Sequence, residues 1–542
     1  MTERPWLKNY PVRWNLDYPR ISLYEHIRRS TAENSDLVAL VFFSKEISFR
    51  QMQENIDRMA AAFTDLGLLK GDRVALMLPN CPEYVYSYYA AMKIGAIVVQ
   101  LNPLYKREEI EFILKDSGAK IFIGIDAAVE SFQEARRGAK LDHVIIVRFT
   151  GAEVAGENLW YDELLEKYPP QSEEAKIDPE EDVAVFQYTG GTTGLPKAAM
   201  LTHFNLVANV TQIKEWLKEW IEIKLAEKMK QHFGIGILPF FHSYGMTCVM
   251  NTGLALPMGQ VLLHRFDMEA LLESVVKYRP ALFPAVPTIY AAVANHPQLA
   301  SYGIHGVIEI CNSGAAPMPL DVMMRFEKET GSKILEGYGL TEASPVTHCN
   351  PLGSLRKPGS VGMPYPDTDS RIVDLADGVT GMAVGEEGEL IIKGPQVMKG
   401  YWNRPDETAE ILRDGWLYTG DIAKMDEQGY FYIVDRKKDL VITGGYNVYP
   451  REVDEVLFDH PKIAEAVTIG ISDDYFGEVL KAFVVLKEGE SARAEEIIEF
   501  CSGKLARYKV PRQVEFRAEL PKSAIGKILR RELIKEEEQK KG

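Results

Sequence analysis

The stretch 188–197 reads Tyr-Thr-Gly-Gly-Thr-Thr-Gly-Leu-Pro-Lys and joins glycine, threonine and lysine in one short segment. Glycines let backbone N–H groups approach an anion, threonine hydroxyls add hydrogen-bond donors, and the lysine adds a positive charge. The segment is not a Walker A motif, because Pro196 precedes Lys197 and Ala198 follows it. We therefore expect it to bind a polyphosphate. For the loop alone, the alternative is a surface turn rich in glycine and threonine.

A second motif, 337–342, reads Gly-Tyr-Gly-Leu-Thr-Glu and ends on a carboxylate. A carboxylate beside a phosphate loop can hold Mg²⁺ that bridges the phosphate oxygens of ATP, so Glu342 is a candidate metal ligand. On its own, a Gly-Tyr-Gly turn is more often structural than functional. The presence of the loop at 188–197 favours the functional interpretation.

Two charged motifs follow further along the chain. Residues 418–421 read Tyr-Thr-Gly-Asp, and the carboxylate of Asp421 can accept two hydrogen bonds from a ribose diol, although a β-turn is the alternative. Residues 435–439 read Asp-Arg-Lys-Lys-Asp, and such a charge run is usually a solvated face. Because this run lies at an expected domain boundary, we expect a hinge, since rotation of a small domain needs only a few residues.

The last motif, 521–527, reads Pro-Lys-Ser-Ala-Ile-Gly-Lys, and by itself would be a surface lysine near the C-terminus. Taken in order, these motifs resemble those of the adenylate-forming superfamily, which includes acyl-CoA synthetases, peptide-synthetase adenylation domains and firefly luciferase. The resemblance covers about 23–533. The double glycine at 190–191 is most similar to the long-chain fatty acyl-CoA synthetase branch, whereas Ala198 stands where the family usually has glycine.

The resemblance implies ATP, Mg²⁺ and CoA as ligands and gives each motif a role. Lys527 matches the catalytic lysine, whose charge would stabilise attack of a carboxylate on the α-phosphate. Glu342 matches the magnesium ligand, with Thr189 as a second metal contact. Lys438 matches the hinge about which a small domain turns between adenylate formation and attack by CoA. Lys197 would clamp the β- and γ-phosphates and would not be the catalytic lysine.

Further site residues follow from the same resemblance. The ring of Tyr338 would stack on adenine, and Asp421 and Arg436 would contact the ribose. Any side chain at Gly445 would block the thiol arm of CoA. The residues expected to bind ATP or AMP are Thr189, Gly190, Gly191, Thr192, Thr193, Gly194, Lys197, Ser313, Gly314, Ala315, Gly337, Tyr338, Gly339, Thr341, Asp421, Ile433 and Arg436. The residues expected to border the CoA tunnel are Gly444, Gly445, Tyr446 and Asn447.

The acid substrate is indicated by the segment 241–243, which reads Phe-His-Ser. Amino-acid-activating relatives carry an aspartate where this chain has His242, so an amino acid is not expected. His242 resembles the gating residue of acyl and aryl synthetases, although a lone histidine is often a hydrogen-bonded core residue. The expected acyl pocket suits a fatty acyl or aryl tail and comprises His242, Tyr244, Met246, Val286, Ile289 and Tyr290. The same side chains would also fill a plain core, so chain length stays open.

We accordingly expect a ligase that activates a medium- to long-chain fatty acid as acyl-AMP and transfers it to CoA. Three alternatives remain at this point. One is a ligase for aryl or other acids, and another is an adenylating enzyme whose acceptor is a carrier protein. The third is a regulatory protein that binds a nucleotide without turnover.

The elements that must position these motifs follow from the hydrophobic pattern. Buried runs alternate with helical periods in a β-α-β-α-β rhythm, which predicts a mostly parallel, helix-covered sheet. The expected strands are 38–48 (as a pair), 72–78, 95–100, 119–124, 143–147, 183–188, 236–238, 281–283 and 308–311. The last three end in small or proline-rich loops, where open α/β sheets bind ligands. The stretch 206–232 is expected to be helical with a surface insertion.

The expected fold is α/β in two domains. Residues 1–435 would form a large N-terminal domain of helix-covered mixed β-sheets, with a β-rich subdomain at about 353–435. Residues 436–542 would form a small mobile α+β domain that carries Lys527.

Bulk composition limits the class of protein. A chain of 542 residues is too long for one hydrophobic core, and its net charge of −16 argues against nucleic acid as a partner. The five cysteines are scattered and include no Cys-x-x-Cys, which suits a reducing cytoplasm and indicates no zinc site. No signal peptide or apolar stretch of about 18 residues occurs. We expect a cytoplasmic monomer or homodimer with small-molecule substrates and peripheral membrane contact to collect fatty acid.

Overall fold

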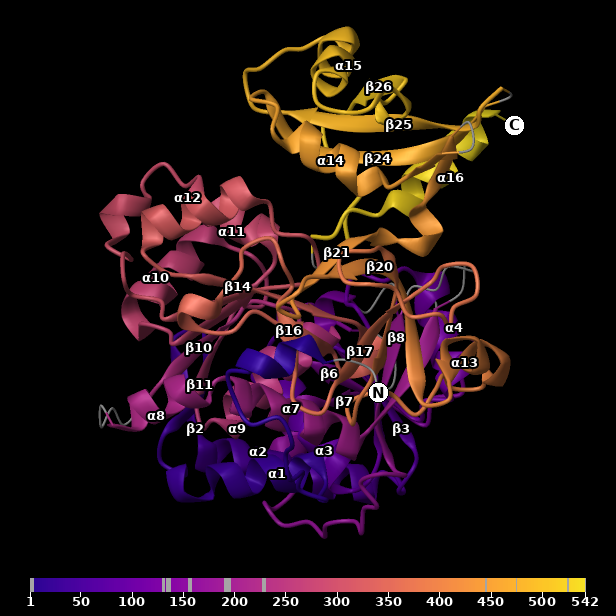
Figure 1. Cartoon of the computed structure of the whole chain (residues 1–542). Coiled ribbons are helices and arrows are strands. Elements are labelled where there is room, and N and C mark those ends of the chain that lie inside the picture. Colours follow the sequence, from indigo (N-terminus) through magenta and orange to yellow (C-terminus); the bar gives the residue numbers. More distant parts are fainter. Residues whose placement is uncertain are drawn as a thin grey trace.

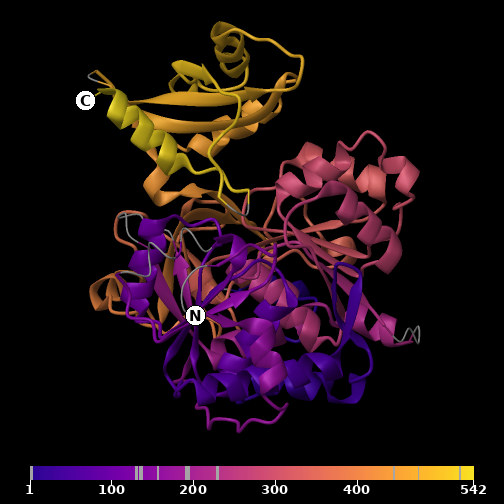
Figure 2. The same cartoon turned by 180° about the vertical axis from the view of Figure 1, so that it is seen from behind.

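The structure is a computed structural model that describes residues 4–128, 132, 138–154, 158–189, 196–226, 231–443, 446–473, 475–523 and 526–541. Figures 1 and 2 show a large N-terminal unit with a smaller C-terminal unit above it. None of the helices in the described ranges combines the length and apolarity needed to cross a bilayer.

One sheet of the large unit carries the strand that leads into the predicted phosphate loop. Its order is β7-β6-β5-β3-β4-β8-β9, and all neighbours are parallel except β8 and β9. The bounds are β3 (Arg73–Met77), β4 (Ile97–Gln100), β5 (Ile121–Ile125), β6 (His143–Val147), β7 (Leu159–Trp160), β8 (Val183–Thr189) and β9 (Lys197–Thr202). The expected parallel sheet is therefore confirmed.

The second sheet of the large unit has the order β16-β15-β14-β13-β12-β10-β11-β1-β2. Its central strands from β1 to β14 are parallel, and its edges are antiparallel. The bounds are β1 (Val38–Phe42), β2 (Lys45–Ser48), β10 (Phe233–Gly236), β11 (Gly259–Leu262), β12 (Leu282–Ala285), β13 (Ile310–Ser313), β14 (Ile334–Gly339), β15 (Val346–Cys349) and β16 (Met363–Pro364).

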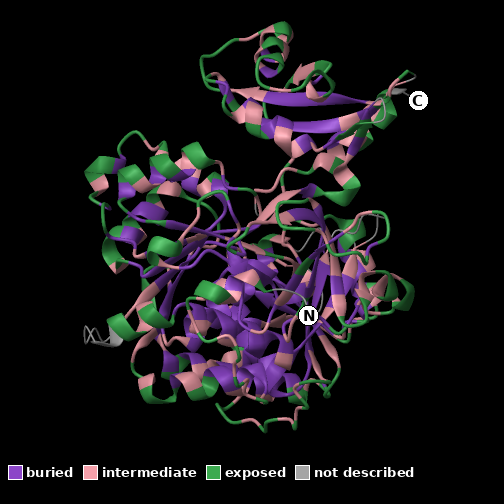
Figure 3. Cartoon of the chain, viewed as in Figure 1, coloured by how far each residue is buried: buried purple, intermediate pink, exposed green. Residues whose placement is uncertain are grey.

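Helices fill the space between these two sheets. The main core cluster joins residues of β3, β4, β5 and β8 with residues of β1 and β11 through α1, α2, α3 and α7. Figure 3 shows this buried centre in purple. The helices of the large unit are α1 (Leu23–Thr31), α2 (Phe49–Asp65), α3 (Pro82–Lys93), α4 (Arg107–Ser117), α6 (Tyr161–Lys167), α7 (His203–Trp216), α8 (Lys218–Ala226), α9 (Thr252–Ala255), α10 (Met268–Tyr278), α11 (Pro287–Ala294), α12 (Leu320–Thr330) and α13 (Pro405–Ile411).

Capping residues explain where two of these helices begin. The Ser48 hydroxyl accepts the N–H of Gln51, and the Gln51 side-chain oxygen accepts the N–H of Ser48, so α2 starts with a capping box. Thr202 and Asn205 make the same reciprocal pair at α7. Short helical turns are η1 (Pro5–Asn9), η2 (Ala32–Asn34), η3 (Asp126–Ala128), η4 (Gly245–Asn251, a π-helix), η5 (Leu299–Tyr302), η6 (Thr341–Ala343), η7 (Gly353–Leu355), η8 (Lys437–Asp439) and η9 (Arg507–Lys509).

Two smaller sheets complete the chain. An antiparallel sheet contains β17 (Asp369–Val373), β18 (Gly388–Lys393), β19 (Leu412–Arg413), β20 (Trp416–Met425) and β21 (Phe431–Arg436). The C-terminal unit contains β22 (Val441–Thr443), β23 (Tyr446–Val448), β24 (Ile463–Asp473), β25 (Gly477–Leu486) and β26 (Gln513–Phe516) with α14 (Pro450–Phe458), α15 (Ala494–Ser502) and α16 (Arg530–Lys541). The chain passes from one sheet to the other through η8.

Several local predictions differ from the structure. The strand expected at 236–238 is β10 at Phe233–Gly236. The side chain of Asn80 explains the early end, because it donates to the carbonyls of Gly236 and Leu238, both at 2.9 Å, and so replaces strand partners. The expected Gly-Tyr-Gly turn at 337–339 is part of β14, where it pairs with β15. The helical stretch begins at His203, directly after Thr202, and residues 227–230 lie outside the described ranges.

Candidate functional site

The predicted phosphate loop leaves the carboxyl end of β8, where parallel sheets bind ligands. Thr189 and Lys197 pair in register on the antiparallel strands β8 and β9, and the Thr189 hydroxyl donates to the Lys197 carbonyl at 3.4 Å. The two described ends of the loop therefore lie side by side. The predictions for Gly190, Gly191, Thr192, Thr193 and Gly194 concern residues outside the described ranges.

Tyr401 connects Lys197 to the candidate magnesium ligand. Its hydroxyl donates to Glu342 Oε1 at 2.7 Å, and its ring centroid lies 5.6 Å from the Lys197 ammonium. Burial and the Glu342 charge raise the pKa of Tyr401, so the hydroxyl stays protonated and keeps donating. Residues 399–402 reach this place because they run beside β9, bridging Ala199 with Tyr401. No spacing in the sequence signals this contact, and Tyr401 was not predicted.

Glu342 lies in η6, directly after β14. Its backbone carbonyl accepts the N–H of Met398 at 2.8 Å, and the neighbouring Thr341 hydroxyl lies 3.3 Å from the Ser243 hydroxyl. Among the described residues, no group of three or more His, Cys, Asp or Glu side chains gathers to hold a metal. A single carboxylate fits Mg²⁺ that is carried mainly by phosphate oxygens and water, and does not fit a metal held by protein alone.

Asp421 and Arg436 face each other in register on β20 and β21. The Tyr338 hydroxyl donates to Asp421 Oδ2 at 2.6 Å, and Arg436 Nε lies 3.3 Å from Oδ1. Asp421 has 8% of its side chain exposed, whereas Arg436 has 45%. The tyrosine and arginine thus fix the orientation of a carboxylate whose remaining lone pairs can accept hydrogen bonds from a ribose. Ile433 lies on the same strand, β21.

The predicted adenine-side residues lie at the carboxyl ends of β13 and β14 or directly after β13. Ser313 ends β13, and Gly314 lies so near Tyr244 that an added Cβ would be 3.3 Å from its ring. Gly339 admits no side chain, because a Cβ would lie 2.2 Å from the Pro345 carbonyl oxygen. Ala315 and Gly337 belong to the same two segments.

Lys527 reaches this region from the C-terminal unit. The loop before it turns through a 2.8 Å hydrogen bond from the Gly526 N–H to the Ser523 carbonyl. Gly526 has φ of +73°, and a Cβ there would lie 2.8 Å from the Thr288 hydroxyl, so the loop rests against α11. Burial, with Arg436 as the next cause, lowers the pKa of Lys527 to about 8. The charges of Arg436 and Asp421 therefore act on Lys527.

His242, a member of the predicted acyl pocket, is influenced by the charge of Lys527. Its Nδ1 accepts the Tyr244 N–H at 3.3 Å, which assigns the proton of the neutral ring to Nε2. Burial and then the Lys527 charge lower the pKa of His242 to about 4. The imidazole is therefore neutral at pH 7 and has one N–H available as a donor.

The predicted acyl residues are gathered around η4, β12 and α11, but they are continuous with the core. The hydroxyls of Tyr244 and Tyr290 both donate to the Asn312 carbonyl at 2.9 Å. Tyr244, Met246 and Val286 belong to the main core cluster, Tyr290 belongs to a neighbouring one, and Ile289 packs against both. Their burial therefore fits a pocket wall and a plain core equally.

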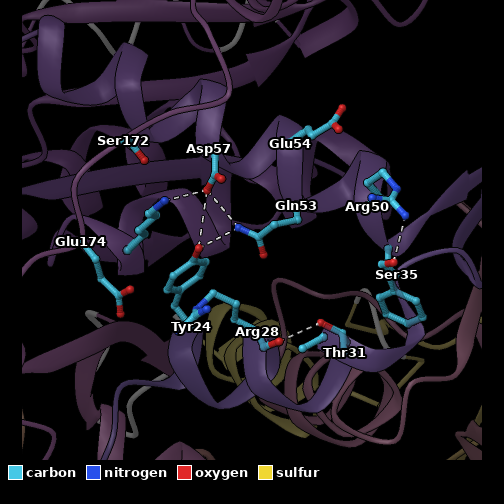
Figure 4. Close-up of a pocket in the computed structure, with 13 residues that line it drawn as sticks. Tyr24, Arg28, Thr31, Ser35, Arg50, Gln53, Glu54, Asp57, Ser172 and Glu174 are labelled. Carbon is cyan, nitrogen blue, oxygen red and sulfur yellow. Dashed lines mark hydrogen bonds and ion pairs between the residues drawn. The ribbon is translucent and has the colours of Figure 1, made fainter.

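A cavity of about 620 Å³ lies away from these residues, between α1 and α2 (Figure 4). Several of its polar groups pair with one another, since Gln53 donates to Tyr24 at 2.7 Å and Lys93 pairs with Asp57 at 2.7 Å, whereas the buried Ser172 hydroxyl has no partner. Its lining residues are Tyr24, Arg28, Thr31, Ala32, Ser35, Phe49, Arg50, Gln53, Glu54, Asp57, Lys93, Ser172 and Glu174. None of them belongs to the predicted site.

The predicted hinge and CoA residues lie in the C-terminal part. Lys438 is in η8, between β21 and β22. Tyr446 and Asn447 are exposed on β23, and the Tyr446 ring stacks on Tyr508 at 4.6 Å. Gly444 and Gly445 lie outside the described ranges.

Comparison with known proteins identifies relatives along almost the whole chain. The family model described as "AMP-binding enzyme" matches residues 27–402, and the model described as "AMP-binding enzyme C-terminal domain" matches 452–527. A "Long-chain-fatty-acid--CoA ligase" of Bacillus subtilis is 45% identical over 99% of this chain and 98% of its own. The protein of the same name in Salmonella typhimurium is 37% identical, covering 98% of both chains.

A solved structure extends the similarity to the arrangement in space. The anthranilate CoA ligase AuaEII in complex with anthranoyl-AMP aligns with a TM-score of 0.87 and 26% sequence identity. The alignment covers 96% of this chain and 98% of that chain.

Proposed function

Because the chain belongs to the family of AMP-binding enzymes, we propose that it is an ATP-dependent ligase that joins a fatty acid to CoA. The observation that carries this proposal is the Asp421 carboxylate held by Tyr338 and Arg436, with the loop before Lys527 resting against α11 of the large unit. These charges surround the place where a nucleotide and a carboxylate would react. The names of the full-length relatives support a fatty acid as the substrate and CoA as the acceptor.

In the first step, the chain's own residues would bind ATP and orient the acid. Asp421, held by Tyr338 and Arg436, would accept the ribose hydroxyls, while Lys197 would hold the phosphates that leave as pyrophosphate. The Lys527 ammonium would stabilise charge that develops at the α-phosphate as the carboxylate attacks. Mg²⁺, held by Glu342 with Thr189 nearby, would neutralise charge on the phosphates.

In the second step, the C-terminal domain, taken as 436–542, would turn about Lys438 relative to residues 1–435. Rotation would withdraw Lys527 and bring the loop containing Gly445 to the site. The CoA thiolate would then attack the acyl carbonyl of acyl-AMP, forming the thioester and releasing AMP. A hinge at η8 is supported by its place as the single short connection between β21 and β22.

The choice of acid is proposed from the site's polarity. The predicted pocket offers apolar side chains and the single N–H of neutral His242, so it suits an acid with an apolar tail. A fatty acid of medium to long chain is our first choice, and an aryl acid is the second. A carrier-protein acceptor remains the alternative to CoA.

We also propose that the protein acts in the cytoplasm, as a monomer or homodimer, and touches a membrane surface to collect fatty acid. Phe43, in the turn between β1 and β2, has 70% of its surface exposed, and Phe266 has 48%. Exposed aromatic side chains of this kind favour the interface of a bilayer. Co-sedimentation with lipid vesicles checks this contact, and Phe43→Glu should reduce it.

The test is pyrophosphate release across a panel of fatty, aryl and amino acids, with and without CoA. The proposal expects pyrophosphate release that depends on a fatty acid. When CoA is also added, AMP and acyl-CoA should form without any carrier protein. If turnover requires a carrier protein, the acyl acceptor is that protein and not CoA. ATP binding without release of pyrophosphate for any acid would contradict the enzymatic function.

A further inference from the structure

Arg530, the first residue of α16, gathers carboxylates from both sides of the hinge. The guanidinium has three carboxylate partners: Asp435 at 3.3 Å, Asp439 at 3.4 Å and Asp454 at 2.6 Å. Asp435 and Asp454 are buried, and Arg530 has 20% of its side chain exposed. Exposed ion pairs add little stability, but this arginine is partly buried and has three acidic partners. Such a cluster fixes the relative position of the segments that it joins.

Asp435 is fully engaged by the C-terminal unit although it belongs to β21. Its Oδ2 accepts the backbone N–H of Arg451 at 2.9 Å, so it caps the start of α14 from another sheet. Its Oδ1 accepts from Arg530 and from the N–H of Arg436. The side chain of Arg451 makes a further link, donating to the Ile433 carbonyl at 2.5 Å.

The order of these residues along the chain decides which contacts a rotation would break. Ile433 and Asp435 precede Lys438, whereas Arg451 and Arg530 follow it. A turn about Lys438 must therefore separate Asp435 from both arginines. The Arg530–Asp454 pair would survive, because both residues follow the hinge. Figure 1 shows α14 and α16 on the side of the C-terminal unit that faces β20 and β21.

We propose that Asp435, Arg451 and Arg530 form a latch that positions Lys527 for the first half-reaction. Arg530 follows Lys527 by three residues, and Asp435 directly precedes Arg436, so the latch joins the backbones that carry two site charges. The three latch residues act as positioning residues, because they reach the reaction only through Lys527 and Arg436. The inference rests on the proposed two-step function.

Buried ion pairs can position Lys527 because they allow only a narrow range of orientations of the C-terminal unit. Removing one partner of a buried pair leaves the other charge without compensation, which is costly, whereas the intact pair adds little net stability. The latch would therefore favour one docking angle of the C-terminal unit over nearby ones. Rotation of the C-terminal unit would leave the Asp435 charge unpaired unless other residues pair with it in the second orientation.

The test compares half-reactions in Arg530→Gln, Asp435→Asn and Arg451→Gln. Misplacing a catalytic group by about 1 Å can cost about 100-fold, so we expect acid-dependent ATP–pyrophosphate exchange to fall about 10- to 100-fold. CoA attack on supplied acyl-AMP should change less than about threefold, because Lys527 has left the site in that step. Arg451→Gln is the variant least able to disturb folding, since it keeps the backbone N–H that donates to Asp435 and loses the side-chain bond to the Ile433 carbonyl.

Arg517→Gln is the matched control. Arg517 is also a partly buried, ion-paired arginine of the C-terminal unit, but its partners Glu515 and Glu536 both follow the hinge. This variant should leave the ratio of the two half-reactions unchanged, whatever its effect on thermal stability. Equal loss of both half-reactions in the latch variants, or the same imbalance in Arg517→Gln, would overturn the proposal.

A second readout does not require activity. The hinge contains Arg436, Lys437 and Lys438, which trypsin can cleave once the backbone loosens. We expect faster cleavage at the hinge in the three latch variants than in the wild type and in Arg517→Gln. Unchanged cleavage would contradict the latch. If the wild-type protein releases no pyrophosphate with any acid, the proposed function fails while this measurement still decides the latch.

Discussion

The nucleotide side of the site consists of polar, hydrogen-bonded residues, whereas the acyl side consists mainly of apolar, packed residues. On the nucleotide side, Asp421, Tyr338 and Arg436 hold one another through defined polar contacts of 2.6 and 3.3 Å. On the acyl side, Met246 and Val286 pack in the same cluster as the helices between the sheets. Each polar residue of the nucleotide side can thus be told from the surrounding core by its contacts. The apolar residues of the acyl side cannot, because they pack as core residues do.

This difference has a consequence for catalysis. Single substitutions on the nucleotide side remove charges that nothing nearby replaces, so each should have a large and specific effect on rate. Substitutions on the acyl side remove volume, which neighbouring side chains can partly fill. The nucleotide side should decide whether the reaction occurs, and the acyl side should decide which acid is used.

The largest effect should come from Lys527, and Lys197 is the lysine to compare it with. Lys527→Ala should lower acid-dependent ATP–pyrophosphate exchange by about 1,000-fold, because it removes charge stabilisation at the reacting phosphate. Lys197→Ala should cost about tenfold, since it weakens only a contact with the departing phosphates. The reverse ranking would show that the roles of the two lysines have been exchanged.

Asp421→Ala should raise the KM for ATP by about 100-fold, because two hydrogen bonds to a charged acceptor are lost. Steady-state kinetics at saturating acid measure this change. Asp426→Ala is the control, since Asp426 lies just beyond β20, pairs with Lys357 and lies outside the site. It should reduce thermal stability without changing the KM for ATP, and a similar rise in both variants would argue against ribose binding by Asp421.

The pH profile should report Lys527. Its pKa is lowered to about 8, chiefly by burial, so the ammonium is charged below pH 8 and loses its charge as pH rises through that value. The kcat/KM of the first half-reaction, which reflects the free enzyme, should therefore fall above pH 8 by about tenfold at pH 9. In Lys527→Arg this limb should disappear from the remaining activity, and its persistence would assign the limb to another group.

The smallest effect should come from the acyl side. If Met246 lines the pocket, Met246→Ala should change the preference between short and long acids a few-fold while the KM for ATP stays within about twofold. Met250→Ala is the control, because Met250 is an equally buried residue of the same π-helix outside the predicted pocket. Both variants should lose about 2–5 kcal/mol of stability. If the two variants prefer the same acids, Met246 is a core residue and does not line the pocket.

The sequence predicted the parts of this molecule whose physical signal is local. The parallel sheets follow from short apolar runs, whereas the roles of Glu342, Asp421 and Lys527 rest on the family resemblance of their motifs and stay predictions. The early end of β10 could not be predicted, because Asn80, more than 150 residues away, supplies its hydrogen bonds.

The supporting residues were missed for a related reason. Tyr401 and Arg530 each contact a partner that is distant in the chain, Glu342 and Asp435, and neither stands in a spacing that signals that partner. Asp435 belongs to a recognised motif, but its link to α14 exists only once the two units are packed. Contacts of this kind depend on tertiary structure and have no local signature.

CoA attack on acyl-AMP, supplied in place of acid and ATP, tests the central claim most directly when Lys527→Ala is compared with the wild type. The account places Lys527 in the first half-reaction alone, so single-turnover formation of acyl-CoA should proceed in the variant within about threefold of the wild-type rate. A loss as large as the loss in adenylation would contradict the division of the reaction between two orientations of the C-terminal unit.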